Sequence, residues 1–303
     1  MQKTIFIYRI PVLFLLLTLW QAQAQEKLPP LRQMEYYRAQ IDSARQERNA
    51  SKMASVYGKI VSLCRENPVL ENELPENLCN YGIWSTNAGN HQTAVGALVE
   101  LLGMPVNTGD TALLTLKARA NNTLGTTYFF LKQWDNALVQ FQKARDMATE
   151  LQNNHGISIA ENNIGDIYQQ KGNYGQAIAH YLRCLQLQEE IGDRETICNT
   201  YYNMATCYSE LKNFSESLAY YNLALNIAKE TGDKEMEALS LMGLADYQAL
   251  EKHQFAEALK LIVRAEAIAK ETGHHQVLAE VYNTRSAIDR ERGDFASALD
   301  YFT

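Results

Sequence analysis

One spacing constrains this chain more than any other feature: a pattern of large, small and aromatic residues recurs every 40 positions between residues 121 and 231. The first copy contains Leu124-Gly125, Tyr128, Ala137, Phe141 and Ala144. The next two copies contain Ile164-Gly165, Tyr168, Ala177, Tyr181 and Cys184, and then Met204-Ala205, Tyr208, Ser217, Tyr221 and Ala224. A fixed period of this length predicts a stacked array of repeated units.

The residue types within each copy predict two closely packed helices. Leu124, Gly125 and Tyr128 are spaced so that they lie along one helix face, and Ala137 and Phe141 do the same on a second helix. Two helices cross closely only where one of them offers a small side chain, and aromatic side chains then fill the groove between hairpins. We interpret these positions as core, with no chemical role.

This order of residues resembles the tetratricopeptide repeat (TPR), which is a helix-turn-helix unit. The period of 40 rather than 34 is similar to the longer-helix variety found in kinesin light chains. The resemblance covers about residues 75–303 and is strongest over 121–270. It implies an all-α fold, a right-handed α-solenoid of stacked TPR hairpins.

The rest of the chain extends the pattern in both directions. Residues 25–103 form degenerate N-terminal hairpins, expected at 31–66 and 75–102, and a segment rich in helix breakers follows at 104–110. A regular array then occupies 112–303 and is truncated in its last hairpin. Turns are expected at Lys132-Gln133, Gly172-Asn173, Gly192-Asp193, Lys212-Asn213 and Gly232-Asp233, and one inserted residue near Glu251–Gln254.

Residues 1–24 have the composition of a secretory signal peptide. Lys3 and Arg9 precede an apolar run that is too short to span a bilayer, and Ala22-Gln23-Ala24 is the small-x-small pattern of a cleavage site. We expect export, most simply into the periplasm of a Gram-negative bacterium. An uncleaved membrane anchor is the alternative.

The net charge and the cysteine content limit which binding partners and which cellular compartment are expected for the protein. The formal net charge of −7 disfavours nucleic acid and anionic membrane surfaces as partners. The five cysteines are an odd number without C-x-x-C spacing, and Cys184, which takes the repeat position of Ala144 and Ala224, is expected to be a small core residue. A bridge between Cys184 and Cys198 is the alternative.

The sequence contains no catalytic signature. It lacks the H-E-x-x-H, G-x-x-x-x-G-K, G-x-S-x-G and G-x-G-x-x-G motifs, and the adjacent pair His274-His275 is poor support for a metal site. We therefore expect no enzymatic activity, no catalytic residue, no metal and no cofactor.

The resemblance to TPR proteins implies a concave groove, lined by the first helix of each hairpin, that binds a protein or peptide. The groove positions carried over to this sequence are Asn122, Thr126, Asn162, Asn163, Asp166, Asn203 and Thr206, with Asn80 in the matching position of the second expected hairpin. An asparagine amide both donates to and accepts from a peptide backbone, so this ladder would hold an extended chain. The alternative is that these side chains only solvate an exposed helix face.

Two functions fit this pattern. The first is an exported scaffold that mediates protein–protein interaction through its groove. The second is the periplasmic sensory region of a membrane signalling protein, with a histidine kinase or DNA-binding output and the transmembrane part beyond residue 303. The apolar residues at the very end of the chain, among them Ala298, Leu299 and Phe302, suggest a fragment of a longer protein or, alternatively, a frayed or dimer-capped end.

Overall fold

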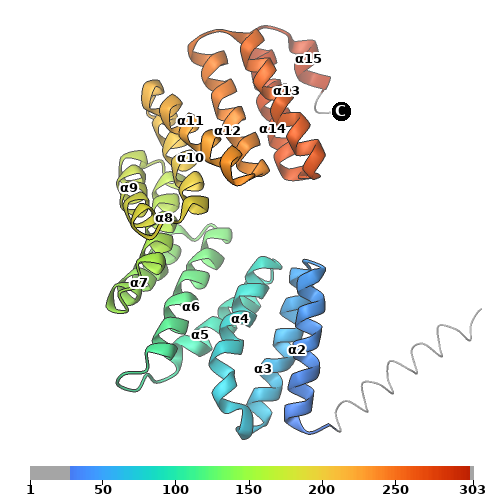
Figure 1. Ribbon diagram of the computed structural model, residues 1–303, viewed down its shortest axis with the longest axis vertical. Coiled ribbons are helices and arrows are strands. Elements are labelled where there is room, and N and C mark those ends of the chain that lie inside the picture. The colour runs from blue at the N-terminus through green and yellow to red at the C-terminus, as the bar shows by residue number, and fades with distance from the viewer. Residues whose placement is uncertain (1–27, 301–303) are drawn as a thin grey trace, which may run out of the picture. The chain divides into compact units, whose positions relative to one another are not determined.

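A computed structural model describes residues 28–300 of the chain, and every regular element in that range is helical (Figure 1). The predicted signal peptide and Phe302 lie outside the described residues. The described residues divide into two compact units, the first ending at Lys132 and the second beginning at Gln133. The prediction of an all-α fold of stacked hairpins is confirmed. The proposed boundaries at 103 and 112 remain a prediction.

Unit 1 consists of helices that pack against their neighbours in chain order (Figure 1). Its elements are α2 (Pro30–Gln46), α3 (Ala50–Glu66), the 3-10 turn η1 (Pro68–Glu73), α4 (Leu74–Asn87), α5 (His91–Gly103) and α6 (Thr111–Phe130). The two expected N-terminal hairpins agree with these bounds, whereas η1 was not predicted. Buried residues from α3, α4, α5 and α6, including Leu78, Leu98 and Leu124, form one continuous core.

Unit 2 continues the pattern, with each helix packed against the next (Figure 1). Its helices are α7 (Trp134–Glu150), α8 (Asn154–Gln170), α9 (Tyr174–Ile191), α10 (Arg194–Glu210), α11 (Phe214–Thr231), α12 (Lys234–Asp246), α13 (Phe255–Thr272), α14 (His275–Glu291) and α15 (Phe295–Asp300), with a π-helical turn η2 (Tyr247–Glu251) after α12. The helices α8, α10, α12 and α14 also contact one another in that order, and we call them the first-helix row.

The single inserted residue of the sixth hairpin lies slightly earlier than expected. The sequence placed it near Glu251–Gln254, but the structure absorbs it in the π-helical turn η2. The backbone N–H of Gln254 donates to the carbonyl of Gln248 at 2.8 Å and closes the widened turn. An extra residue inside a helix is commonly absorbed in this way, because a π turn keeps the flanking turns hydrogen-bonded.

Glycine and aspartate act together where one hairpin joins the next. Gly192 has a φ of 72° and ends α9, while the side chain of Asp193 accepts a hydrogen bond from the backbone N–H of Thr196 and begins α10. Gly232 and Asp233 repeat both roles between α11 and α12. A left-handed C-cap followed at once by an N-cap reverses the chain within two residues.

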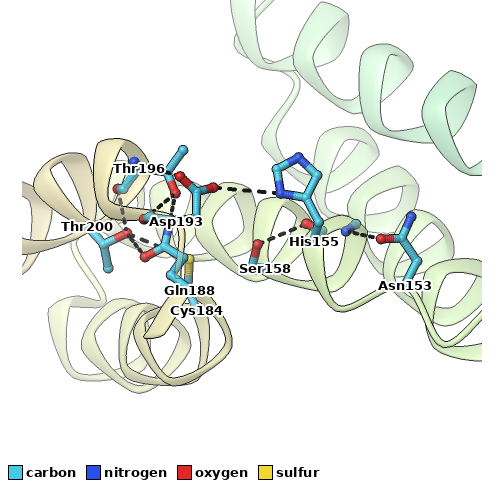
Figure 2. Close-up of polar contacts among 9 residues, drawn as sticks. Asn153, His155, Ser158, Cys184, Gln188, Asp193, Thr196 and Thr200 are labelled. Carbon is cyan, nitrogen blue, oxygen red and sulfur yellow. Dashed lines mark hydrogen bonds and ion pairs between the residues drawn. The ribbon is translucent and has the colours of Figure 1, made fainter. Parts of the chain in front are cut away.

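A buried polar network also connects α9 to the start of α10 (Figure 2). Gln188, which is 4% exposed, donates to the hydroxyl of Thr196 and accepts from the hydroxyl of Thr200, each at 2.9 Å. The carboxylate of Asp193 lies 3.7 Å from Nδ1 of His155 on α8. Because both ends of the Gln188 amide are satisfied, the network fixes how the two hairpins meet without leaving a buried polar atom unpaired.

The five cysteines are free thiols with buried side chains. The sulfur of Cys184 lies 3.7 Å from the hydroxyl of Thr200, and the thiol of Cys198 donates to the carbonyl of Ala224 at 3.2 Å. Burial raises the pKa of both thiols to about 11. Cys184 occupies a small core position, as the sequence predicted.

The turns inside hairpins contain a residue with a left-handed backbone conformation, and this residue is not always glycine. Gly172 has a φ of 71°, and Lys212, 40 residues later, has a φ of 57°. A residue with a Cβ adopts this conformation at a cost of roughly 1 kcal/mol. We predict that Gly172→Lys lowers the free energy of unfolding by about 1 kcal/mol and that Lys212→Gly raises it by less, both measured by urea denaturation.

A control for this prediction is Lys212→Ala, which keeps the Cβ and is expected to change stability little. Nothing lies within 4 Å of a Cβ added at Gly172, so a clash does not contribute to the expected loss. Equal stability of Gly172→Lys and the wild type would contradict the argument.

Candidate functional site

The seven predicted groove residues are divided between the two units. Asn122 and Thr126 lie on α6 in unit 1, and the other five lie on α8 and α10 in unit 2. Both α6 residues are partly buried, and the Thr126 hydroxyl donates to the backbone carbonyl of Asn122 at 3.1 Å. We therefore treat the unit 2 residues as a candidate site of their own.

A cluster centred on Asp166 brings together three of the five predicted residues in unit 2. Its carboxylate accepts a hydrogen bond from the amide of Asn203 on α10 at 3.2 Å and one from the amide of Asn162 on α8 at 3.3 Å. The hydroxyl of Tyr181 on α9 lies 2.7 Å from the carboxylate and 2.7 Å from Oε1 of Gln169. We call these residues the Asp166 cluster, and they connect three consecutive helices.

The Asp166 cluster contains two contacts that the sequence did not predict. The amide nitrogen of Asn203 donates to the carboxylate of Asp166, and the role of this amide toward a ligand stays a prediction. The aromatic residue Tyr181 was expected only to fill space, but its hydroxyl shares the carboxylate of Asp166. A core position thus supplies a polar group to the candidate site because a tyrosine ring reaches from the second helix to the first.

Gly165 makes room for this tyrosine. A Cβ added at Gly165 would lie 2.5 Å from Cε1 of Tyr181, which is 0% exposed. A glycine also makes room for a tyrosine between hairpins, since a Cβ at Gly243 on α12 would lie 2.4 Å from Cε1 of Tyr221 on the preceding helix α11. The glycine is therefore required for close approach of the aromatic ring, as the sequence predicted for Gly165.

Thr206 lies at the next site along the row. Its hydroxyl is 3.0 Å from the backbone carbonyl of Tyr202 and 3.3 Å from the hydroxyl of Tyr221. The rings of Tyr202 and Tyr221 meet edge to face, with centroids 5.7 Å apart. Burial raises the pKa of Tyr202 to about 12, so both hydroxyls remain protonated and able to donate at neutral pH.

Asp246 is a functional candidate that the sequence analysis missed. It follows Leu244-Ala245 at the end of α12, as Asp166 follows Ile164-Gly165 on α8. Asp246 could have been identified from the sequence, because it lies one residue after a large-small pair, as Asp166 does. Within residues 28–300 no basic side chain forms an ion pair with Asp166 or Asp246, and burial raises the pKa of each to about 6.

Glu161 on α8 shows the opposite environment. This buried carboxylate lies 2.6 Å from Nδ1 of His180 and 3.7 Å from the guanidinium of Arg145. The His180 ring stacks on Tyr168 with centroids 5.3 Å apart. Since basic side chains already surround Glu161, we assign it a structural role. Asp166 and Asp246 remain as the acidic candidates for ligand binding in the first-helix row.

Two further properties bear on the site. The described part of the chain has no group of three His, Cys, Asp or Glu residues placed to hold a metal ion. In the same part, no helix has the length and apolar character needed to cross a membrane.

Comparison with known families gives a match to the tetratricopeptide repeat at residues 116–190, 156–230 and 196–271, which together cover just over half of the chain. A comparison with curated proteins gives no match.

Several solved structures share the fold. The apo form of the quorum sensor NprR from B. thuringiensis is 18% identical, with a TM-score of 0.72 over 93% of this chain and 77% of that one. Aspartyl phosphate phosphatase F from Bacillus subtilis is 16% identical, with a TM-score of 0.70 over 95% and 72%. The Rap conjugation gene regulator of plasmid pLS20, in complex with the Phr* peptide, is 16% identical, with a TM-score of 0.63 over 86% and 69%.

The environment of Asp246 predicts a pH dependence of stability. Its pKa is about 6 in the folded state and has an ordinary value of 3.8, so the folded state binds more protons between pH 4 and 6. Stability contributed by protonated Asp246 is therefore lost as the pH rises through this window. We expect the wild type to lose on the order of 2 kcal/mol relative to Asp246→Asn between about pH 4 and pH 7.

The difference in free energy of unfolding, measured by urea denaturation at several pH values, tests this expectation. Glu216→Gln, which removes an exposed carboxylate, is the matched control. A constant difference between wild type and Asp246→Asn over the whole range would show that the carboxylate is well solvated.

Proposed function

This chain belongs to the tetratricopeptide repeat family, and we propose that it is a scaffold that binds a protein or peptide along the first-helix row of unit 2. The observation that carries the proposal is the Asp166 cluster, which joins partly exposed polar groups of adjacent first helices. One similar structure is a complex with a peptide, which supports the same class of ligand.

The polar groups of the row favour a ligand that donates hydrogen bonds. Asp166 and Asp246 are carboxylates without a basic partner among the described residues, and Thr206 lies between them in the repeat order. Backbone N–H groups and basic side chains of an extended segment would donate to these carboxylates, in addition to the neutral donors that Asp166 already has. An ordinary acidic segment would instead meet like charge, so we expect neutral or basic ligands to be preferred.

We also propose that the chain has no catalytic activity of its own. The absence of nucleophile, phosphate-binding and metalloprotease motifs in the sequence supports this. One similar structure is described as a phosphatase, and a likeness of fold at this identity does not transfer an activity.

Selection from a random peptide library tests the binding proposal. Peptides that bind the wild-type chain are expected to lose about tenfold in affinity for Asp246→Ala, because one charge-assisted hydrogen bond is removed. Asn203→Ala is expected to weaken binding as well, since the amide that orients the Asp166 carboxylate is lost.

Glu189→Ala, an exposed acidic position on the second helix α9, is the control and should bind like the wild type. Circular dichroism of each variant separates loss of binding from loss of folding. If every selected peptide binds the three variants equally, the ligand does not lie on the first-helix row.

We propose further that the chain is exported and works in the periplasm. We also propose that its repeats are of the kinesin-light-chain-like variety. Lys3, Arg9 and the pattern Ala22-Gln23-Ala24 support export, and the 40-residue period supports the repeat variety. Fractionation of the native host followed by N-terminal sequencing is expected to find a mature chain that begins at Gln25. A cytoplasmic chain that retains Met1 would refute export.

A further inference from the structure

A cavity of about 310 Å³ lies in unit 1. Its lining comes from α2, α3, η1 and α4, and the lining residues are Arg38, Ile41, Asp42, Arg45, Tyr57, Ile60, Glu73, Glu76, Asn77 and Asn80. Ile41, Ile60 and the ring of Tyr57 are buried and give the cavity an apolar floor. The charged side chains around it are exposed or partly exposed, so the cavity opens to solvent.

The charges that line the cavity do not balance. The guanidinium of Arg38 pairs with Glu73 at 3.0 Å, and the guanidinium of Arg45 lies 3.6 Å from Asp42. Glu76 is the remaining charge, and it forms no ion pair with any residue in 28–300. An occupant that carries one positive charge would neutralise the lining.

Tyr57 supplies a second, independent sign of a ligand. It is only 7% exposed, yet its hydroxyl makes no hydrogen bond to any other described residue. Burial raises the pKa of Tyr57, and nearby Glu76 and Asp42 raise it too, whereas Arg45 and Arg119 lower it. The side chain is thus largely buried while its hydroxyl, which has no partner among the described residues, remains available to an occupant of the open cavity that it lines.

Three of the groups around the cavity can accept a hydrogen bond from an occupant. They are the carboxylate of Glu76, the hydroxyl oxygen of Tyr57 and the amide oxygen of Asn80, which also has no partner within the described range. A protonated primary amine has three donors and no acceptor, so it matches these three groups. The apolar floor formed by Ile41 and Ile60 would accommodate a short methylene stem.

We propose that this cavity binds a protonated primary amine carried on an aliphatic stem, with Glu76 as its counter-ion and Tyr57 and Asn80 as hydrogen-bond acceptors. Such a group belongs to a lysine side chain of a bound protein or to a small free amine. The site is separate from the first-helix row, so it stands whether or not a peptide binds there.

Isothermal titration with three small probes tests the proposal and separates the two sources. The probes are Nα-acetyl-lysine methylamide, which mimics a lysine side chain within a protein; n-pentylamine, a free amine of similar stem; and Nα,Nε-diacetyl-lysine methylamide, which lacks the charge. We expect saturable binding of at least one of the two amines and at least a tenfold weaker response to the neutral probe. Binding of the lysine derivative alone identifies a protein side chain as the source, and binding of pentylamine alone identifies a free amine.

Variants of the lining test the assigned groups. Glu76→Gln is expected to weaken amine binding at least tenfold, and Tyr57→Phe, which keeps the buried ring, is expected to weaken it several-fold. Glu71→Gln removes an exposed acid of η1 that does not line the cavity and should bind like the wild type. Chemical-shift changes of the Asn80 side-chain amide on addition of the amine provide a readout that a loss of folding would not imitate.

Three results would overturn the proposal. One is the absence of saturable binding of both amines at millimolar concentration. Another is equal binding of the charged and neutral lysine derivatives. The third is an equal effect of Glu71→Gln and Glu76→Gln, which would mean that the amines respond to net charge and not to this cavity.

Discussion

The contact between a glycine on one helix and a tyrosine ring on a neighbouring helix is the constraint on which unit 2 depends. A Cβ at Gly165 or at Gly243 would penetrate the ring of Tyr181 or Tyr221. The close approach allows each ring to be buried and also carries its hydroxyl to the first-helix row. Packing and polar chemistry are therefore set by the same pair of residues, because a tyrosine is apolar along its ring and polar at its tip.

Burial has different consequences for the carboxylates of unit 2. Glu161 is surrounded by bases and holds α7, α8 and α9 together. Asp166 is held by neutral donors, and Asp246 lacks an ion-pair partner among the residues described. Removing a carboxylate from water is unfavourable unless a partner replaces the water, so burial raises the pKa of the two aspartates, which lack the basic partners that Glu161 has.

The sequence was sufficient to predict the helices and the small positions of the repeat, because these follow from local spacing and volume. It identified Gly165 and the turns at Gly172 and Lys212 for that reason. It did not predict that Tyr181 bonds Asp166, since this depends on where the tip of the ring lies after the two helices of the hairpin have packed. The cavity beside Tyr57 was missed likewise, because α2, α3 and α4 contribute to it from distant parts of the chain.

The π-helical turn η2 has a consequence for how repeat length is controlled. The added residue is accommodated within Tyr247–Glu251, and the next hairpin still begins with a left-handed glycine, Gly273. The contacts of α12 with α13 and α14 are retained around it. Repeat length in this chain is thus a local property of each hairpin, so insertions at helix ends alter loop spacing while neighbouring hairpins keep their register.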